Sequence, residues 1–200
     1  MVIAGKIAKL SKGRYYKPET GAFGELLPTR KQIVKDLLED NGKFVGYLTG
    51  YSIYNELGLT TQMSNVIQIG KNRVRNAFKR DRYTISFIRQ ENNINKENIS
   101  LLQILDCIRY IKKIPDTSIE NSCKRFMVII TDLSKEDVSS MTRLAQKYSS
   151  ATRALYGAII EELGYNGLSS QLFKTLNPIT KYNLTGVDKV LSNSQKWNIV

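Results

Sequence analysis

The spacing of apolar residues divides the chain into a mixed first half and a mainly helical second half. Short apolar and aromatic segments flank the turn Ser11-Lys12-Gly13, which predicts a β-hairpin over residues 6–17. A glycine-containing loop over 19–28 follows and is the candidate domain boundary. Apolar residues at helical spacing then predict helices over 29–40 and over 51–57, the second capped at Thr49.

Two segments with an alternating pattern predict strands. Over 83–88, Tyr83, Ile85 and Phe87 share one face, and we expect Tyr83 and Phe87 to be core residues. Residues 65–69 alternate in the same way. We expect the two strands to pair across the loop 70–82, as a hairpin does.

The second half predicts several helices. Residues 99–114 have a continuous apolar stripe that Pro115 ends, and 150–163 has apolar residues at four-residue spacing before a glycine. A capping sequence at Ser134 opens another helix between them. Residues 126–130 fit either a buried strand or a buried helical turn. The fold class that these elements predict is mixed α/β, with a mainly helical domain around a small sheet.

The composition is that of a folded globular protein. Apolar residues make up 42% of the 200 residues and charged residues 24%, which is enough apolar material for a core. No apolar run approaches the roughly 18 residues that a bilayer-spanning helix needs. The first residues also lack the order of regions that defines a signal peptide. We therefore expect a cytoplasmic protein that does not bind a membrane.

Candidate catalytic chemistry is sparse in this sequence. The absence of histidine removes the usual general base near neutral pH. Cys107 and Cys123 are too few ligands for a tetrahedral zinc site, and we expect two buried thiols. Glycine-rich phosphate loops and a GxSxG elbow are absent from the sequence. We expect a protein that is not an enzyme and that binds no cofactor and no metal.

The basic residues are concentrated in the first half of the chain. Residues 1–89 carry 16 Lys and Arg against 7 Asp and Glu, a net charge of +9, whereas residues 90–200 carry 14 against 11. This asymmetry favours a polyanion as partner of the first half, although a solvated surface without a partner is the alternative. The candidate nucleic-acid contacts are Lys12, Arg14 and Lys17 at the hairpin tip, and Lys71, Arg73, Arg75, Lys79, Arg80 and Arg82 in the loop.

Four segments resemble, in their order and spacing, the AbiEi-like family of antitoxins and transcriptional regulators. They are LSKGRYYKP at 10–18, GYLTGY at 46–51 continuing to NELGLTTQ at 55–62, YTISFIR at 83–89, and LQILD at 102–106 with IKKIP at 111–115. The resemblance extends from about residue 5 to about residue 185.

The resemblance implies a winged helix-turn-helix that binds promoter DNA, followed by a domain that opposes a toxin of nucleotidyltransferase type. The resemblance also implies that the antitoxin and the toxin need not form a tight complex. The antitoxin is then expected to repress its own operon. The domains are then a wing hairpin remnant over 1–25, an AbiEi-like antitoxin domain over 26–185 and a polar C-terminal tail over 186–200. Because five residues precede the hairpin, we expect the recognition helix to be missing and promoter recognition to be weakened.

Two other functions remain open on the sequence. The basic loop 71–82 fits an RNA backbone as well as duplex DNA, and it also fits an acidic patch on a partner protein. Asp106 and Arg109, three residues apart on a predicted helix, are expected to form a surface pair of small energetic value. The tyrosines expected to pack against other side chains rather than stack on bases are Tyr15, Tyr16, Tyr47, Tyr51 and Tyr54.

Overall fold

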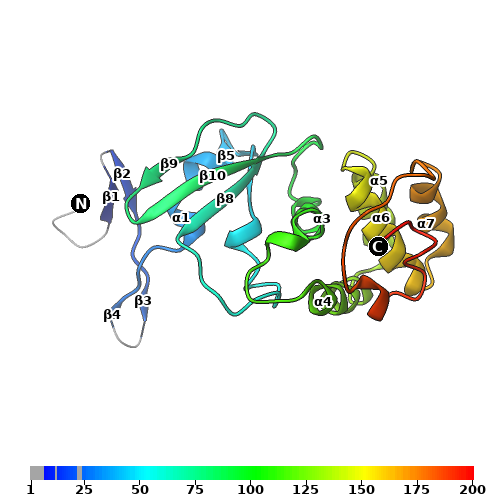
Figure 1. Cartoon of the computed structure of the whole chain (residues 1–200). Helices are drawn as coiled ribbons and strands as arrows, with labels where there is room; N and C mark the ends of the chain where they lie inside the picture. Colours follow the sequence, from blue (N-terminus) through cyan, green and yellow to red (C-terminus); the bar gives the residue numbers. More distant parts are fainter. Residues whose placement is uncertain (1–6, 12, 22–23) are drawn as a thin grey trace.

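The computed structural model describes residues 7–11, 13–21 and 24–200, and it confirms the mixed α/β class (Figure 1). The first described elements form two β-hairpins. They are β1 (Ala8–Ser11) with β2 (Arg14–Tyr16), and β3 (Thr20–Gly21) with β4 (Gly24–Glu25). The first is the predicted hairpin, with Gly13 in its turn at a φ of 73°. The second lies within 19–28, where the sequence predicts only a loop.

The helix predicted over 29–40 is shorter than expected and is interrupted. Thr29 forms a capping box: its hydroxyl oxygen accepts from the Gln32 backbone N–H, and the Gln32 side chain accepts from the Thr29 backbone N–H. Val34, at a φ of −116°, then separates α1 (Arg30–Ile33) from α2 (Lys35–Leu38). The helical spacing of the apolar residues is preserved across the break, so they still share one face.

A third hairpin replaces the end of that predicted helix. It pairs β5 (Glu39–Asp40) with β6 (Lys43–Phe44). Asn41 has a φ of 47° and Gly42 a φ of 76°, and these are the positive values that a two-residue Asn-Gly turn needs. The glycine therefore belongs to a hairpin turn and not to a helix end.

The helix predicted over 51–57 is wrong. Only a single 3-10 turn, η1 (Gly50–Ser52), is present, and turns follow it. Thr49 makes no side-chain cap bond, because its hydroxyl donates to Asp106 instead. The Tyr51 backbone N–H donates to the Gln68 side-chain oxygen at 3.0 Å, so a side chain of β8 satisfies a group that a helix cap would have served.

A four-stranded sheet forms the centre of the first half. Its members are β7 (Tyr47–Thr49), β8 (Val66–Lys71), β9 (Phe78–Arg80) and β10 (Tyr83–Arg89), in the order β7-β8-β10-β9. The predicted pairing of β8 with β10 is confirmed, but it is parallel, with Val66 opposite Thr84. The prediction that these two strands form a hairpin is therefore wrong, because parallel strands need a longer connection. That connection contains β9, which pairs antiparallel with β10.

Apolar side chains from α1 and α2 cover one face of this sheet. Ile67, Ile69 and Ile85 pack there against the buried residues of the two short helices. Tyr83 and Phe87 are half-buried at the margin of this cluster rather than deep in the core. The other face of the sheet meets α3, as Figure 1 shows, and the larger cluster of buried residues begins there.

The second half consists mainly of helices. They are α3 (Ile99–Arg109), η2 (Ile111–Lys113), α4 (Ile119–Thr131), α5 (Lys135–Ala145), α6 (Ser150–Glu162), α7 (Asn166–Phe173) and η3 (Val187–Lys189). Residues 126–130, which fitted either a strand or a helical turn, belong to α4. Ser134 caps α5 as expected, accepting from the Asp137 backbone N–H at 3.0 Å. Among the described residues, no helix has the length and apolar character needed to cross a bilayer.

The C-terminal segment is not a solvated tail. Val187, Leu191, Trp197 and Ile199 are all buried within the larger cluster. Backbone hydrogen bonds link Tyr182 to Asn198 at 2.8 Å and to Val200 at 2.9 Å. The predicted boundary at 185 is therefore wrong, because the last residues fill the helical core.

Candidate nucleic-acid interface

The six basic residues of 71–82 do not lie in one loop. Lys71 ends β8, Arg73 and Arg75 lie in the connection, and Lys79 and Arg80 belong to β9. Arg82 lies in the turn before β10. The strand β9 therefore divides the cluster, and its members face different surroundings.

Four of the six cations are exposed, and none of the four forms an ion pair with a described residue. They are Arg73, Arg75, Lys79 and Arg82. The Arg75 guanidinium carbon lies 4.4 Å from the centre of the Phe78 ring, and that of Arg82 lies 5.1 Å from the centre of the Tyr83 ring. Aromatic rings order these groups without neutralising their charge, so the charge remains available to an anion.

Arg80 is a correction to the predicted interface. Its residue surface is 5% exposed, and its guanidinium forms two hydrogen bonds with the Asp36 carboxylate at 2.7 and 3.1 Å. It also donates to the Ile33 carbonyl at 2.7 Å. The side chain therefore ties β9 to α1 and α2, and a phosphate cannot reach it.

Lys71 is neither freely exposed, like those four cations, nor fully buried, like Arg80. Its ammonium donates to the Leu37 carbonyl oxygen at 3.3 Å, and the side chain is half-buried beside α2. The carbonyls at the end of a helix carry partial negative charge that suits a cation. The predicted contact of Lys71 with nucleic acid would require its hydrogen bond to the Leu37 carbonyl to break.

The hairpin tip can be described only in part. Lys17 is exposed but follows β2 at the open end of the hairpin, away from the turn at Gly13, so its predicted place at the tip is wrong. Lys12 and the side chain of Arg14 lie outside the described residues. The hairpin is close to β9: Gly13 and Tyr15 line a surface hollow together with Asp36, which binds Arg80. Figure 1 shows the same arrangement, with β1 and β2 next to the end of the sheet where β9 turns into β10. The described part of this hairpin therefore lies in the same region of the molecule as β9.

Asp106 is a second correction, because it is fully buried and not a surface pair with Arg109. Its carboxylate accepts hydrogen bonds from the hydroxyls of Tyr47 at 2.7 Å, Thr49 at 2.8 Å and Tyr148 at 2.9 Å. Arg109 points to the surface, where its guanidinium donates to the Arg89 carbonyl oxygen.

Gln90 extends this polar network at the end of β10. Its amide nitrogen donates to the hydroxyl oxygens of both Tyr47 and Tyr148 at 2.8 Å, and its amide oxygen accepts from Asn92. The network therefore joins the sheet to α3 and to the residues that follow α5.

The ionisation of the network follows from its burial. Burial raises the pKa of Asp106 above its usual value, and the hydrogen bonds from the three hydroxyls oppose that rise in part. Burial and the neighbouring Asp106 raise the pKa values of Tyr47 and Tyr148 further above the physiological range, so both phenols stay protonated. The geometry is that of a structural junction between the sheet and the helices.

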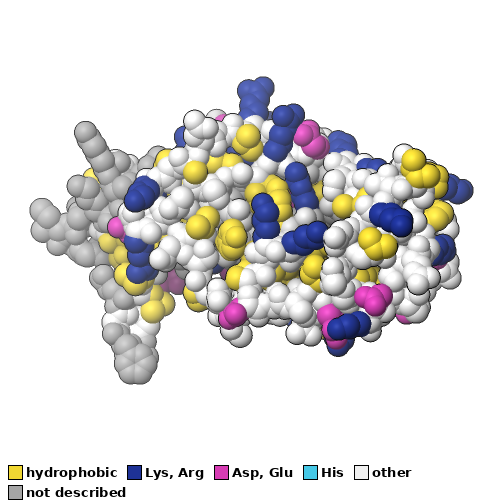
Figure 2. All heavy atoms as spheres, viewed as in Figure 1, with side chains coloured by type: hydrophobic (Ala, Val, Ile, Leu, Met, Phe, Trp, Pro, Cys, Tyr) yellow, Lys and Arg dark blue, Asp and Glu magenta, His cyan; other side chains and the backbone are white. Residues whose placement is uncertain are grey.

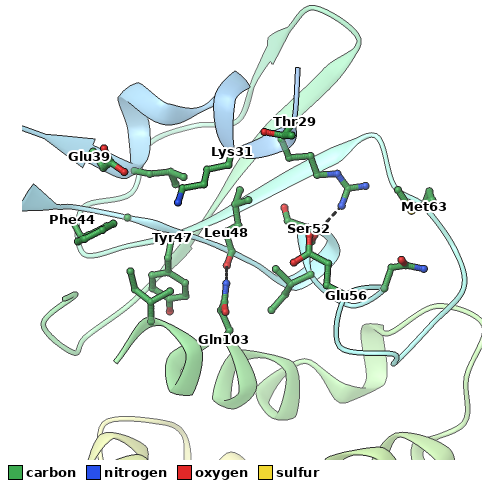
Figure 3. Close-up of a pocket in the computed structure, with 16 residues that line it drawn as sticks. Thr29, Lys31, Glu39, Phe44, Tyr47, Leu48, Ser52, Glu56, Met63 and Gln103 are labelled. Atoms are coloured by element: carbon green, nitrogen blue, oxygen red, sulfur yellow. Dashed lines mark hydrogen bonds between the residues drawn. The ribbon is translucent and has the colours of Figure 1, made fainter. Parts of the chain in front are cut away.

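A groove lies between α1, β6 and α3, with a volume of about 460 Å³. Figure 3 shows Lys31 and Glu39 at one rim, Met63 at the other and Gln103 below, where its amide donates to the Leu48 carbonyl at 2.8 Å. Its walls are mainly apolar, and the charges at its rim are of both signs. Such a groove can hold a small apolar molecule, but it has no preference for a polyanion.

A third basic group was missed by the sequence prediction. Arg109, Lys112, Lys113 and Lys181 line one cavity, although Lys181 is far from the others in the chain. The run IKKIP was noticed only as part of the family resemblance, because nothing in the sequence indicates that Lys181 lies beside it. Both cysteines are buried thiols, as expected. No three His, Cys, Asp or Glu residues in the described part of the chain are placed to hold a metal ion.

No family model matches the chain, and no curated protein and no solved structure matches it either.

Proposed function

We propose that this protein is a non-enzymatic antitoxin of an AbiE-like toxin–antitoxin system, which binds duplex DNA in the cytoplasm and represses its own operon. The observation that carries the proposal is the set of four exposed cations at 73, 75, 79 and 82, which have no acidic partner among the described residues. Binding of such unpaired cations to a phosphate backbone is favourable, because it releases the counterions that are condensed on the backbone.

The surroundings of these cations support a nucleic-acid contact. Aromatic rings hold Arg75 and Arg82 in place, so less side-chain entropy is lost when a phosphate binds. Contacts of this kind position a protein on DNA, whereas sequence is recognised through base edges.

The toxin partner rests on the resemblance of the four sequence segments to AbiEi-like proteins. It is a nucleotidyltransferase-type protein that need not contact this chain directly. The corresponding genetic expectation is a toxin gene in the same operon, whose effect on growth this chain suppresses.

The test is fluorescence anisotropy of the full chain with its own upstream duplex and a scrambled duplex, across a salt series. If each of the four cations contacts one phosphate, the slope of log affinity on log salt concentration is about −4. The variant R73A/R75A/K79A/R82A should lose most of that slope. The matched control replaces four exposed cations elsewhere, Lys96, Lys135, Arg143 and Lys174, and should retain it.

The possible outcomes separate the proposal from its alternatives. Preference for the native duplex supports a repressor, and equal binding to both duplexes limits the chain to a general DNA contact. Stronger binding to a structured RNA at the same ionic strength would favour the RNA-binding alternative. If neither nucleic acid binds at about 150 mM salt, the DNA proposal is wrong and the basic surface is better explained by a protein partner.

A further inference from the structure

A cavity of about 480 Å³ lies between the end of α3, the start of α6 and residues 181–184. Its rim is strongly basic, since four exposed cations line it and no Asp or Glu does. These cations are Arg109, Lys112, Lys113 and Lys181. None of them forms an ion pair with a described residue. In Figure 2, Lys and Arg side chains gather near the middle of the face shown, next to α3.

The start of α6 adds to this positive field. Ala151 and Thr152 in its first turn line the cavity, and the helix is 13 residues long. Its first turn contains no acidic residue. Ser149 caps the helix by accepting from the Thr152 backbone N–H, and the partial positive charge at the helix N-terminus still favours an anion at this position.

The floor of the cavity is apolar, which suits a ligand that is more than a simple ion. Ile111, Leu155 and Leu184 are buried residues in its lining. Tyr110 is half-buried beside them, and its ring centre lies 5.1 Å from both the Arg109 guanidinium carbon and the Lys113 ammonium nitrogen. An aromatic ring flanked by two cations offers a flat surface next to a binding site for negative charge.

Tyr182 is an unusual member of the lining. It is 6% exposed, and its hydroxyl is buried without a hydrogen-bond partner among the described residues. A buried hydroxyl without a partner costs free energy. The hydroxyl itself is not exposed to the cavity, so Tyr182 packs in the wall and makes no polar contact with a ligand.

We propose that this cavity binds a nucleoside phosphate, with the phosphates at the four cations and the base over the apolar floor. The volume is in the range of small-molecule sites, roughly 300 to 1,000 Å³. The cavity shares no residue with the four cations at 73–82, so this inference is independent of the proposed DNA contact. A loss of one binding activity in the experiments therefore leaves the other intact.

The experiment is isothermal titration calorimetry of the full chain with ATP, AMP, adenosine and inorganic triphosphate at low ionic strength. We expect ATP to bind more tightly than AMP, and both more tightly than adenosine, because each phosphate adds charge. Inorganic triphosphate should bind at least tenfold more weakly than ATP, because it lacks the base. Equal binding of triphosphate and ATP would overturn the nucleoside part of the proposal, and no heat from ATP at millimolar concentration would overturn all of it.

Two charge reversals locate the site. K112E and K181E should each weaken ATP binding at least fivefold, while K96E, at an exposed lysine in the loop before α3, should leave it unchanged. Equal weakening in all three variants would show a general effect of net charge and would refute the cavity as the site. Unchanged emission from the buried Trp197 shows that each variant is folded, so a loss of binding reports on the site.

Discussion

Asp106 is a buried carboxyl group that receives three hydroxyl hydrogen bonds from two separate parts of the chain. Two of the donors, Tyr47 and Thr49, lie on β7, and the third, Tyr148, follows α5. Removing one partner from such a network leaves buried polar groups unsatisfied. The single carboxyl group therefore fixes the position of the sheet relative to the helices, and its protonation affects how strongly they are held.

The raised pKa of Asp106 predicts a pH dependence of stability. Because the pKa is higher in the folded state than in the unfolded state, the stabilising contribution is complete below the unfolded value and is lost as pH rises through the folded value. In D106N this titration is absent, so the free energy of unfolding should fall less between pH 4 and pH 8 than in the wild type. Within the interval between the two pKa values the difference is at most about 1.4 kcal/mol per pH unit.

Urea denaturation at a series of pH values measures this effect. D188N, at an exposed aspartate, is the control and should follow the wild-type profile. Parallel profiles for D106N and the wild type would show that Asp106 does not titrate in this range.

At the scale of elements, the best-predicted parts are those that local chemistry determines. Ser134 caps α5 because a hydroxyl before a helix can accept from its first N–H groups, whatever the rest of the fold. The end of α6 is also determined by local chemistry, since Gly164 directly after the helix adopts a φ of 88°. The β1–β2 hairpin and the strand β10 follow from glycine placement and alternation in the same way.

The parts that sequence did not predict depend on contacts between distant residues. The parallel direction of β8 and β10 is decided by where β9 is inserted, which the alternation of either strand does not encode. The burial of Asp106 depends on three hydroxyls, two from β7 and one from Tyr148, which follows α5. The basic cavity needs Lys181 to meet the end of α3. No local pattern contains this information, because each residue type alone is typical of a solvated surface.

The packing of the C-terminal segment on α6 provides a test at this scale. A Cβ added at Gly157 would lie 2.3 Å from ring atoms of Trp197, so G157A should destabilise the protein by about 1–3 kcal/mol. Helix propensity alone predicts the opposite sign, a gain of about 1 kcal/mol. G167A is the matched control: this helical glycine has open space around it, and its replacement should be neutral or stabilising.

Urea denaturation followed by tryptophan emission makes the measurement, since Trp197 is the one tryptophan in the chain. Equal effects of the two substitutions would show that the segment does not pack on α6 as described.

At the scale of the whole molecule, two apolar clusters share the sheet. The cluster under α1 and α2 and the larger helical cluster are both contacted by Leu48 of β7. The buried network around Asp106 adds a polar connection between the sheet and the helices. A molecule connected in this way is expected to unfold in one cooperative transition.

Arg80 offers the test of that cooperativity. R80M removes the hydrogen bonds to Asp36 and Ile33 and should lower the free energy of unfolding by about 1–2 kcal/mol, a value reduced because Asp36 is partly exposed. The emission of Trp197, in the other cluster, should report the same shift. R82A, at an exposed position, should change stability by no more than about 0.5 kcal/mol. A tryptophan transition that stays in place while circular dichroism shows earlier loss of structure would mean that the clusters unfold separately.

The position of β9 has one more consequence, which concerns self-association. Among the described strands it is an edge of the sheet, and it is only three residues long. An edge strand has unpaired backbone groups that can recruit a strand from another molecule, and short length and lysine side chains oppose such recruitment. Lys79 is exposed on β9, and its charge repels a second copy of the same edge. The charge that suits a phosphate backbone therefore also keeps concentrated protein from aggregating through this edge.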